Sequence, residues 1–378
     1  MSDPQQDARW MSRALHLAEQ GRYSTHPNPR VGCVLVREGQ VVGEGAHLRA
    51  GGPHAEVVAL RAAGDRARGA TAYVTLEPCS HHGRTPPCAD ALIEAGVARV
   101  VAAMKDPNPL VAGRGLERLS AAGIETCAGV LEADARALNS GFIKRMETGR
   151  PLVRVKVAAS LDGRTAMASG ESKWITGPAA RADVQRLRAQ SSAVITGIET
   201  VLADDCQLTV RDPELVRSRA EQPLRVVLDS RLRLPEACAL LAADGPVWVA
   251  TTHTAMSARP DTMARLNARP GTRVLTLPET RFGYLDLNAL LEALGKAEIN
   301  EALVEAGATL AGAFVSEGLV DELWWYQAPV LLGHDARPGA RLEGLDQLAR
   351  APRWRIADSR AIGQDWRFIL ERLSCSQG

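Results

Sequence analysis

The chain has 378 residues, of which 46% are hydrophobic and 24% are charged, and its formal net charge is +1. This length predicts about two domains, and the nearly balanced charge argues against the strongly basic surface that duplex nucleic acids require. No apolar run approaches the roughly 20 residues that span a bilayer and no signal-peptide pattern opens the chain, so we expect a cytoplasmic protein with reduced cysteines.

The first part of the chain alternates helix-like and strand-like segments. Helical spacing of apolar residues predicts the helices, and short aliphatic runs predict the strands. Such alternation is typical of an α/β layer architecture. The predicted helices span 8–20, 54–63, 89–95 and 115–122, and the predicted strands span 31–36, 40–46, 70–76 and 99–104.

A polar segment with glycine and proline, RMETGRP at 145–151, predicts a domain boundary. The α/β pattern restarts beyond it, so we expect two domains, at 1–147 and 148–378. The closing segments 322–330, 354–359 and 366–373 have the pattern of antiparallel strands at a sheet edge. The other strands predicted in this half span 152–158, 193–197, 224–229, 247–251, 273–277 and 302–305.

Residues that commonly bind zinc gather around two short motifs, HAE at 54–56 and PC at 78–79. A catalytic zinc takes three protein ligands and leaves the fourth position to water, and His54, Cys79 and Cys88 supply such a set. Glu56, near the start of a predicted helix, can reach the metal-bound water without binding the metal. This order of residues is typical of zinc nucleobase deaminases, in which the glutamate is the general acid and base.

Removing an amino group from a pyrimidine requires each of these parts. Zinc lowers the pKa of water towards ~7 and makes hydroxide available. Glu56 then takes the proton of the water, protonates a ring nitrogen and helps ammonia to depart. The alternative is a structural zinc site or ordinary buried cysteines, because eight residues separate Cys79 from Cys88 where this motif usually has two. Apolar packing roles are expected for the other cysteines: Cys33, Cys127, Cys206, Cys238 and Cys375.

With these motifs the sequence resembles a known family, the bifunctional deaminase–reductases of riboflavin biosynthesis. In the first half the resemblance rests on THPNPRVGCVLV (25–36), HAE, TLEPCSHHGRTPPC (75–88) and KDPNPLVAGRG (105–115). It implies a cytidine-deaminase-like three-layer domain. The implied substrate has a 2,5-diaminopyrimidinone ring and a phosphoribosylamino tail, and loses its C2 amino group. The implied substrate contacts are Asn28, His47, His81 and Arg84.

Chemistry agrees with these substrate contacts, because an asparagine amide can pair with the edge of a base and arginine or imidazole can bind phosphate. The alternative reading is loop capping by Asn28 and a solvated surface for His81 and Arg84.

Residue patterns alone leave the function of the second half open. Small residues after a strand, as in EAGATLAGAF at 305–314, let backbone N–H groups approach a pyrophosphate. A strict G-x-G-x-x-G is absent, which argues against a standard Rossmann fingerprint. The family resemblance, however, continues through ASLDGRTAMASGES, WITG, TVLADD, LTVR, VVLDS and VEAGATLAGAF. It implies a dihydrofolate-reductase-like domain that binds NADPH and delivers hydride to the ribosyl C1′, which opens the sugar to a ribityl chain.

The resemblance also assigns residues in this half. Arg188 and Arg211 suit a phosphate clamp, because guanidinium forks match phosphate oxygens, and the alternative is solvated helix and loop charges. Lys156 could bind substrate or lie at the surface, and we assign it no role. The implied substrate contacts are Ser172, Arg188, Leu208, Arg211 and Glu305. The implied NADPH contacts are Ala158, Trp174, Thr200, Asp204, Ser230, Gly307, Ala308, Thr309, Leu310, Ala311, Gly312 and Ala313.

Two other functions stay open as alternatives. An RNA-acting base deaminase with an appended binding module needs a basic face rich in aromatic residues, whereas aromatic residues are 4% of this chain. A zinc-stabilised scaffold would have no use for Glu56. The leading interpretation predicts one Zn²⁺ in the first domain, NADPH in the second, a small-molecule phosphoribosyl-pyrimidine substrate, no nucleic-acid or membrane partner, and a homo-oligomer.

Overall fold

The computed structural model describes residues 3–80, 87–108, 112–219 and 221–373. The chain divides into two compact units, Met1–Gly149 and Arg150–Gly378. The division follows helix α6 (Ser140–Thr148), which ends at Gly149 because glycine accommodates the positive φ of 71° found there. The boundary expected after residue 147 lies inside the last turn of this helix.

The first unit contains a five-stranded sheet with the order β2-β1-β3-β4-β5. β1 runs antiparallel to both of its neighbours, whereas β3, β4 and β5 run parallel to one another. The four predicted strands are present, but β5 was not predicted because its sequence ETCA has no apolar run. The strands are β1 (Gly32–Arg37), β2 (Gln40–Ala46), β3 (Thr71–Val74), β4 (Arg99–Ala102) and β5 (Glu125–Ala128).

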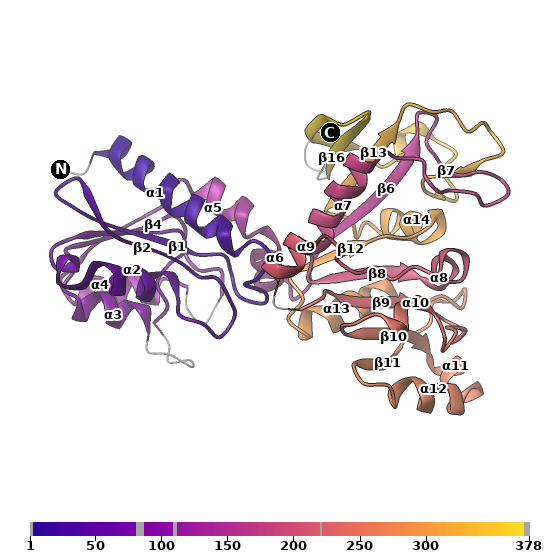
Figure 1. Ribbon diagram of the computed structural model, residues 1–378, viewed down its shortest axis with the longest axis horizontal. Helices are drawn as coiled ribbons and strands as arrows, with labels where there is room; N and C mark the ends of the chain where they lie inside the picture. Colours follow the sequence, from indigo (N-terminus) through magenta and orange to yellow (C-terminus); the bar gives the residue numbers. More distant parts are fainter. Residues whose placement is uncertain (1–2, 81–86, 109–111, 220, 374–378) are drawn as a thin grey trace. The chain divides into compact units, whose positions relative to one another are not determined.

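Helices cover both faces of this sheet, with α1 and α5 on one side and α2, α3 and α4 on the other (Figure 1). Gly45 of β2 allows α2 to lie close to the sheet, because a Cβ there would stand 2.3 Å from the carbonyl oxygen of Ala55. The four predicted helices are present, and α5 and α6 were not predicted. The bounds are α1 (Pro4–Ala18), α2 (Ala55–Ala63), α3 (Cys88–Glu94), α4 (Arg114–Ala121) and α5 (Glu132–Leu138), with 3₁₀ turns at Glu19–Gly21 and Gly64–Ala67.

The second unit contains a nine-stranded sheet with the order β11-β10-β9-β8-β12-β6-β13-β16-β15. The strands from β11 to β13 are parallel, and only the β13–β16 and β16–β15 pairs are antiparallel. The first of the three predicted antiparallel edge strands, β13, therefore lies inside the sheet beside β6. The strands are β6 (Leu152–Ser160), β8 (Ala193–Gly197), β9 (Leu224–Leu228), β10 (Val247–Thr252), β11 (Thr272–Leu277), β12 (Glu301–Val304), β13 (Glu322–Ala328), β15 (Trp354–Ile362) and β16 (Asp365–Arg372).

Smaller elements complete this unit. An additional two-stranded sheet pairs β7 (Arg164–Ala166) with β14 (Arg337–Pro338), and a 3₁₀ turn spans Leu348–Arg350. The helices are α7 (Pro178–Gln190), α8 (Ile198–Asp204), α9 (Pro213–Ser218), α10 (Ala239–Ala242), α11 (His253–Ala258), α12 (Pro260–Asn267), α13 (Leu287–Lys296) and α14 (Ala308–Ser316). None of the described helices of either unit combines the length and hydropathy that crossing a membrane would require.

The central parallel strands of the large sheet are buried on both faces, because their successive residues alternate between two apolar clusters. Val226 packs with α13 and α14 on one face, whereas Val227 packs with α7, α8 and α12 on the other. Strands covered on both faces have the continuous apolar sequences from which they were predicted. This arrangement leaves the carboxyl ends of the parallel strands for functional residues.

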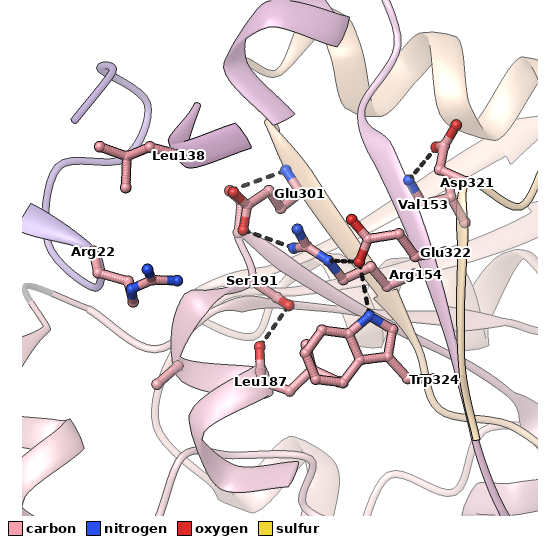
Figure 2. A network of polar contacts seen from close by, with 12 residues as sticks. Arg22, Leu138, Val153, Arg154, Leu187, Ser191, Glu301, Asp321, Glu322 and Trp324 are labelled. Carbon is pink, nitrogen blue, oxygen red and sulfur yellow. Dashed lines mark hydrogen bonds and ion pairs between the residues drawn. The ribbon is translucent and has the colours of Figure 1, made fainter. Parts of the chain in front are cut away.

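A buried polar network joins three neighbouring strands of this sheet, β12, β6 and β13 (Figure 2). Arg154 of β6, 4% exposed, donates to Glu301 of β12 at 3.0 Å and to Glu322 of β13 at 2.8 Å. The Trp324 indole N–H donates to the same Glu322 oxygen at 2.7 Å. Because a shift in pairing would separate these charges, the network favours the observed register of β12, β6 and β13.

Replacing Arg154 by methionine is expected to lower the free energy of unfolding of the second unit by about 3–5 kcal/mol, because the buried carboxylate of Glu301 loses this guanidinium. Urea unfolding followed by tryptophan fluorescence measures this loss, since only Trp10 of the seven tryptophans precedes residue 150. The matched control is Arg355→Met, which removes a surface pair with Glu371 and should cost at most about 1 kcal/mol. Equal midpoints for the two variants would mean that the network adds no stability.

Candidate functional site

Three metal-binding side chains meet at one end of the first unit. His54 immediately precedes α2, Cys88 is the first residue of α3, and Cys79 follows β3. Their ligand atoms all lie within 4.8 Å of one another. His54 Nδ1 is 3.2 Å from Cys88 Sγ and 3.7 Å from Cys79 Sγ, and the Cys88 backbone N–H donates to Cys79 Sγ at 3.3 Å. The structure thus brings together the three residues that the sequence predicts as zinc ligands.

The chemistry of these three donors fits zinc. Hydrogen bonds from the Cys88 thiol and from His54 lower the pKa of the Cys79 thiol, and zinc binds the thiolate form. Among the described residues this is the only group of histidine, cysteine and acidic side chains close enough to hold a metal ion. Three ligands rather than four are typical of catalytic zinc sites.

Glu56 lies in the first turn of α2, beside these ligands, and is 3% exposed. Burial, together with the nearby charge of Cys79, raises the pKa of its carboxyl group to about 7. A carboxyl group whose pKa lies near neutrality can both accept and release a proton at physiological pH. Both the position and the environment of Glu56 therefore suit a proton carrier.

The predicted substrate residues Asn28 and His47 contact each other beside the zinc ligands. His47 Nδ1 donates to the carbonyl oxygen of Pro53 at 3.0 Å, which leaves Nε2 to accept from the Asn28 amide at 3.0 Å. The His47 ring also packs edge-on against the His54 ring, with centroids 5.4 Å apart. Burial lowers the pKa of His47 and favours its neutral form. Two further predicted residues, His81 and Arg84, lie outside the described residues.

Glu77, which sequence reasoning did not single out, organises the chain around Cys79. Its buried carboxylate accepts backbone N–H groups from Asp106 at 3.0 Å, Gly113 at 2.9 Å and Gly115 at 2.9 Å. A Cβ on Gly115 would stand 1.9 Å from the carbonyl oxygen of Pro78, so only glycine fits there. Glu77 thus ties both ends of the KDPNPLVAGRG segment to the Pro78–Cys79 turn. The sequence did contain a hint of this role, because Glu77 is the glutamate of TLEPC, which belongs to the motif quoted for the family resemblance.

The predicted cofactor residues of the second unit gather at the carboxyl ends of neighbouring parallel strands. Ala158 lies in the carboxyl half of β6, Thr200 and Asp204 lie in α8 directly after β8, and Ser230 follows β9. Gly307 precedes α14, which follows β12, and Ala308, Thr309, Leu310 and Ala313 lie in this helix. The carboxyl edge of a parallel sheet is where α/β folds bind their ligands.

Three of the predicted cofactor residues have a different environment. Ala311 is 1% exposed in the apolar core, and a Cβ on Gly312 would stand 1.9 Å from the carbonyl oxygen of Arg341. Both therefore face protein, as expected for a helix that presents only one side to a ligand. Trp174, on the loop between β7 and α7 together with Ser172, is 69% exposed and packs against the Arg181 guanidinium at 4.6 Å.

Positive charges surround Glu305 at the same sheet edge. Arg188 of α7 holds the Glu305 carboxylate through two hydrogen bonds, one of 3.0 Å, and donates to the carbonyl oxygen of Thr209 at 3.1 Å. Lys156 Nζ lies 3.8 Å from Glu305. Burial opposes ionisation of Glu305, but Arg188, Lys156 and Arg211 together lower its pKa. Three cations around one carboxylate leave a net positive charge that suits an anionic substrate.

This cluster changes two interpretations made from the sequence. Arg188, expected as half of a phosphate clamp, is buried and already paired with Glu305, whereas Arg211 is exposed. Lys156, to which no role was assigned, points into the cluster, which no local sequence pattern could reveal. The predicted residue Leu208 lies close by, is 5% exposed and has a positive φ of 56°.

Comparison with known families and proteins covers nearly the whole chain. Residues 151–368 match the family described as RibD C-terminal domain, and residues 4–104 match the family described as cytidine and deoxycytidylate deaminase zinc-binding region. The riboflavin biosynthesis protein RibD of Escherichia coli K12 is 55% identical over 368 residues, which are 95% of this chain and 98% of that protein. The RibD of Haemophilus influenzae Rd is 50% identical, with 95% and 96% covered.

Solved structures of RibD proteins are also similar to this chain over nearly its whole length. RibD of Acinetobacter baumannii, form 1, superposes with a TM-score of 0.89 at 50% identity and covers 98% of this chain and 100% of that one. A diaminohydroxyphosphoribosylaminopyrimidine deaminase/5-amino-6-(5-phosphoribosylamino)uracil reductase from Thermotoga maritima superposes with a TM-score of 0.85 at 32% identity, with 98% and 99% covered. The expected fold class, a cytidine-deaminase-like domain followed by a dihydrofolate-reductase-like domain, is confirmed.

Proposed function

This chain belongs to the RibD family of riboflavin-biosynthesis proteins, and from that premise we propose which of its residues carry out each reaction. It is a bifunctional enzyme that deaminates 2,5-diamino-6-(5-phosphoribosylamino)pyrimidin-4(3H)-one and then reduces the ribosyl chain with NADPH. We assign deamination to residues 1–147 and reduction to residues 148–378. This assignment rests on the separation of the two sites. His54, Cys79 and Cys88 lie beside the buried Glu56 in the first unit, whereas the positive charges around Glu305 lie at the sheet edge of the second.

For deamination, His54, Cys79 and Cys88 hold the metal, which when bound acidifies water and so supplies the nucleophile. Glu56 accepts the proton that this water releases and passes it to a ring nitrogen. It then takes the proton of the hydroxyl group now on C2 and delivers it to the amino group, so that the C–N bond breaks, ammonia leaves, a C2 carbonyl forms and the carboxyl group ends in its starting state. The Asn28–His47 pair presents amide and imidazole groups to the edge of the pyrimidine, and His81 and Arg84 contribute substrate contacts.

For reduction, NADPH supplies the hydride when it is bound at the carboxyl edge formed by β6, β8, β9 and β12. The predicted cofactor residues at this edge and at the start of α14 bind NADPH. Trp174 of the loop between β7 and α7 also contacts the cofactor, and Ser172 of the same loop contacts the substrate. Arg188 holds Glu305, and the net positive charge that Lys156, Arg188 and Arg211 leave beside it attracts the phosphorylated substrate to this edge of the sheet. The protein contributes chiefly proximity and orientation, because the cofactor carries the reactive hydrogen.

The substrate is a small-molecule pyrimidine, and the comparisons give no support to the RNA-deaminase alternative. We propose in addition that the protein works in the cytoplasm as a homo-oligomer without a nucleic-acid partner. The net charge of +1 supports the last point. The outer hairpin of the large sheet supports self-association, because Ile356 of the edge strand β15 is 58% exposed and Trp366 of β16 is 50% exposed.

Incubating the purified protein with the diaminopyrimidine phosphoribosyl compound tests both activities together. Ammonia should appear without NADPH, and the nicotinamide absorbance should fall only when NADPH is added and deamination has taken place. Ammonia release without any later NADPH oxidation would contradict the bifunctional assignment.

Lys156 should set the alkaline limit of the reductase. Burial lowers its pKa below the ordinary 10.5, against the opposing effect of Glu305 and with a smaller contribution from Arg188. As the pH rises through this lowered pKa, the site loses a positive charge and kcat/KM for the deaminated substrate should fall. Lys156→Arg keeps its charge, so the alkaline limb should move to higher pH. Identical pH profiles of kcat/KM for the two proteins would exclude Lys156 as the titrating group.

A further inference from the structure

The segment Leu208–Arg211, here called the clamp segment, lies between α8 and α9 and belongs to no helix or strand. Buried backbone groups of such a segment need partners from elsewhere. The backbone of Leu208 also needs support, because its φ of 56° is unfavourable for a leucine and persists only where surrounding groups stabilise it. Something outside the segment must therefore keep it in this conformation.

Side chains hold three consecutive residues of the clamp segment. Arg188 donates to the carbonyl oxygen of Thr209 at 3.1 Å, and Gln185 accepts the backbone N–H of Arg211 at 2.8 Å. Both of these side chains come from α7. Between them, Val210 is held on both of its backbone groups by a single side chain from the other side of the segment.

That side chain is Gln222, two residues before β9. Its Oε1 accepts the Val210 N–H at 2.9 Å, and its Nε2 donates to the Val210 carbonyl oxygen at 3.0 Å. An amide paired in this way replaces the two hydrogen bonds that a neighbouring strand would make. Its own position is confined, because a Cβ on Gly245 would stand 2.6 Å from the Gln222 Cβ. The half-buried Gln222 thus binds both backbone groups of Val210 and packs closely against Gly245.

We propose that Gln222 is a positioning residue of the reductase, which fixes the backbone from which Arg211 reaches the substrate phosphate. This inference rests on the proposed function. After Arg188 and Lys156, Arg211 also helps to lower the pKa of Glu305, so its charge acts on the same cationic cluster that the supported segment borders. Without Gln222, the clamp segment can relax out of its strained conformation and carry Arg211 away. Gln222 itself acts only through the backbone of Val210.

The test is a double-mutant cycle in the full-length protein, with the deaminated phosphoribosyl substrate and NADPH. Gln222→Ala should raise the substrate KM about tenfold, the equivalent of one to two hydrogen bonds, and leave kcat and the NADPH Kd within about twofold. In an Arg211→Ala background, the same change should raise KM less than twofold, because the group that it positions is already absent. Gln222→Glu retains the size but sets a carboxylate against the Val210 carbonyl oxygen, so it should behave like Gln222→Ala.

Controls separate this role from a general loss of structure. Gln364→Ala, in the exposed turn between β15 and β16, should leave every constant unchanged. Thermal midpoints report whether each variant folds, and deaminase activity of the same chains reports whether the first unit is unaffected. If Gln222→Ala does not fold, the isosteric Gln222→Glu provides the same comparison.

The results that would overturn the inference differ from those that would overturn the function. A wild-type protein that never oxidises NADPH with this substrate removes the proposed function and the inference with it. An active wild type with an unchanged KM in Gln222→Ala and Gln222→Glu overturns the inference alone. The inference is also overturned if Gln222→Ala raises the substrate KM equally in the wild-type and Arg211→Ala backgrounds, or if it weakens NADPH binding to the same extent. Either result would make Gln222 a merely structural residue.

Discussion

Replacing Glu56 by glutamine is expected to lower the rate of deamination by about 10²- to 10⁴-fold while zinc stays bound. Glutamine fills the same buried space but cannot accept or release the proton that the reaction moves between water, ring nitrogen and leaving ammonia. The three metal-binding side chains are untouched, so metal content should remain at one zinc per chain. Ammonia release and metal analysis of the same preparation measure the two quantities.

Two comparisons make this experiment decisive. Glu94→Gln, an exposed glutamate at the end of α3, should keep wild-type deamination. NADPH oxidation with already deaminated substrate should be unchanged in Glu56→Gln, because the second unit carries that step. Unchanged deamination in Glu56→Gln would show that a group other than Glu56 moves the proton, and loss of zinc would show that Glu56 supports the metal rather than the proton transfer.

Replacing Arg211 by alanine is expected to raise the reductase KM for the phosphorylated substrate by about 10- to 100-fold and to leave the NADPH Kd unchanged. Hydrogen bonds between charged groups contribute about 1.5–3 kcal/mol, and the exposed guanidinium of Arg211 is available to make them. Arg188 cannot take its place, because it already binds Glu305 and Thr209. Steady-state kinetics and a separate NADPH titration measure the two constants.

The matched control is Arg217→Ala, which removes an exposed arginine from the neighbouring helix α9 and should leave KM unchanged. A substrate that lacks the phosphate should bind the wild type and Arg211→Ala equally weakly. A parallel loss of NADPH affinity, or the same penalty with the phosphate-free substrate, would show that Arg211 does not clamp the phosphate.

Local patterns predicted four strands and four helices of the first unit, the nine strands of the large sheet in the second unit, and the residues proposed as zinc ligands. Motifs such as HAE and PC are readable because the chemistry demands these residue types at short, fixed spacing. The failures have local causes as well. The strand β5 has only four residues and no apolar run, and β13 was placed at an edge because its sequence does not reveal that it pairs with β6.

The sequence by itself determined the two-unit α/β plan and singled out the three side chains proposed as zinc ligands and the glutamate beside them, because these depend on periodicity and on residue type. Only the tertiary structure decided that Glu77 ties a distant segment to Cys79, that Lys156 faces Glu305, and that Gln222 supports Val210. Each of these contacts joins groups far apart along the chain. They depend on strand order, register and the path of loops, and no local pattern of residues encodes those.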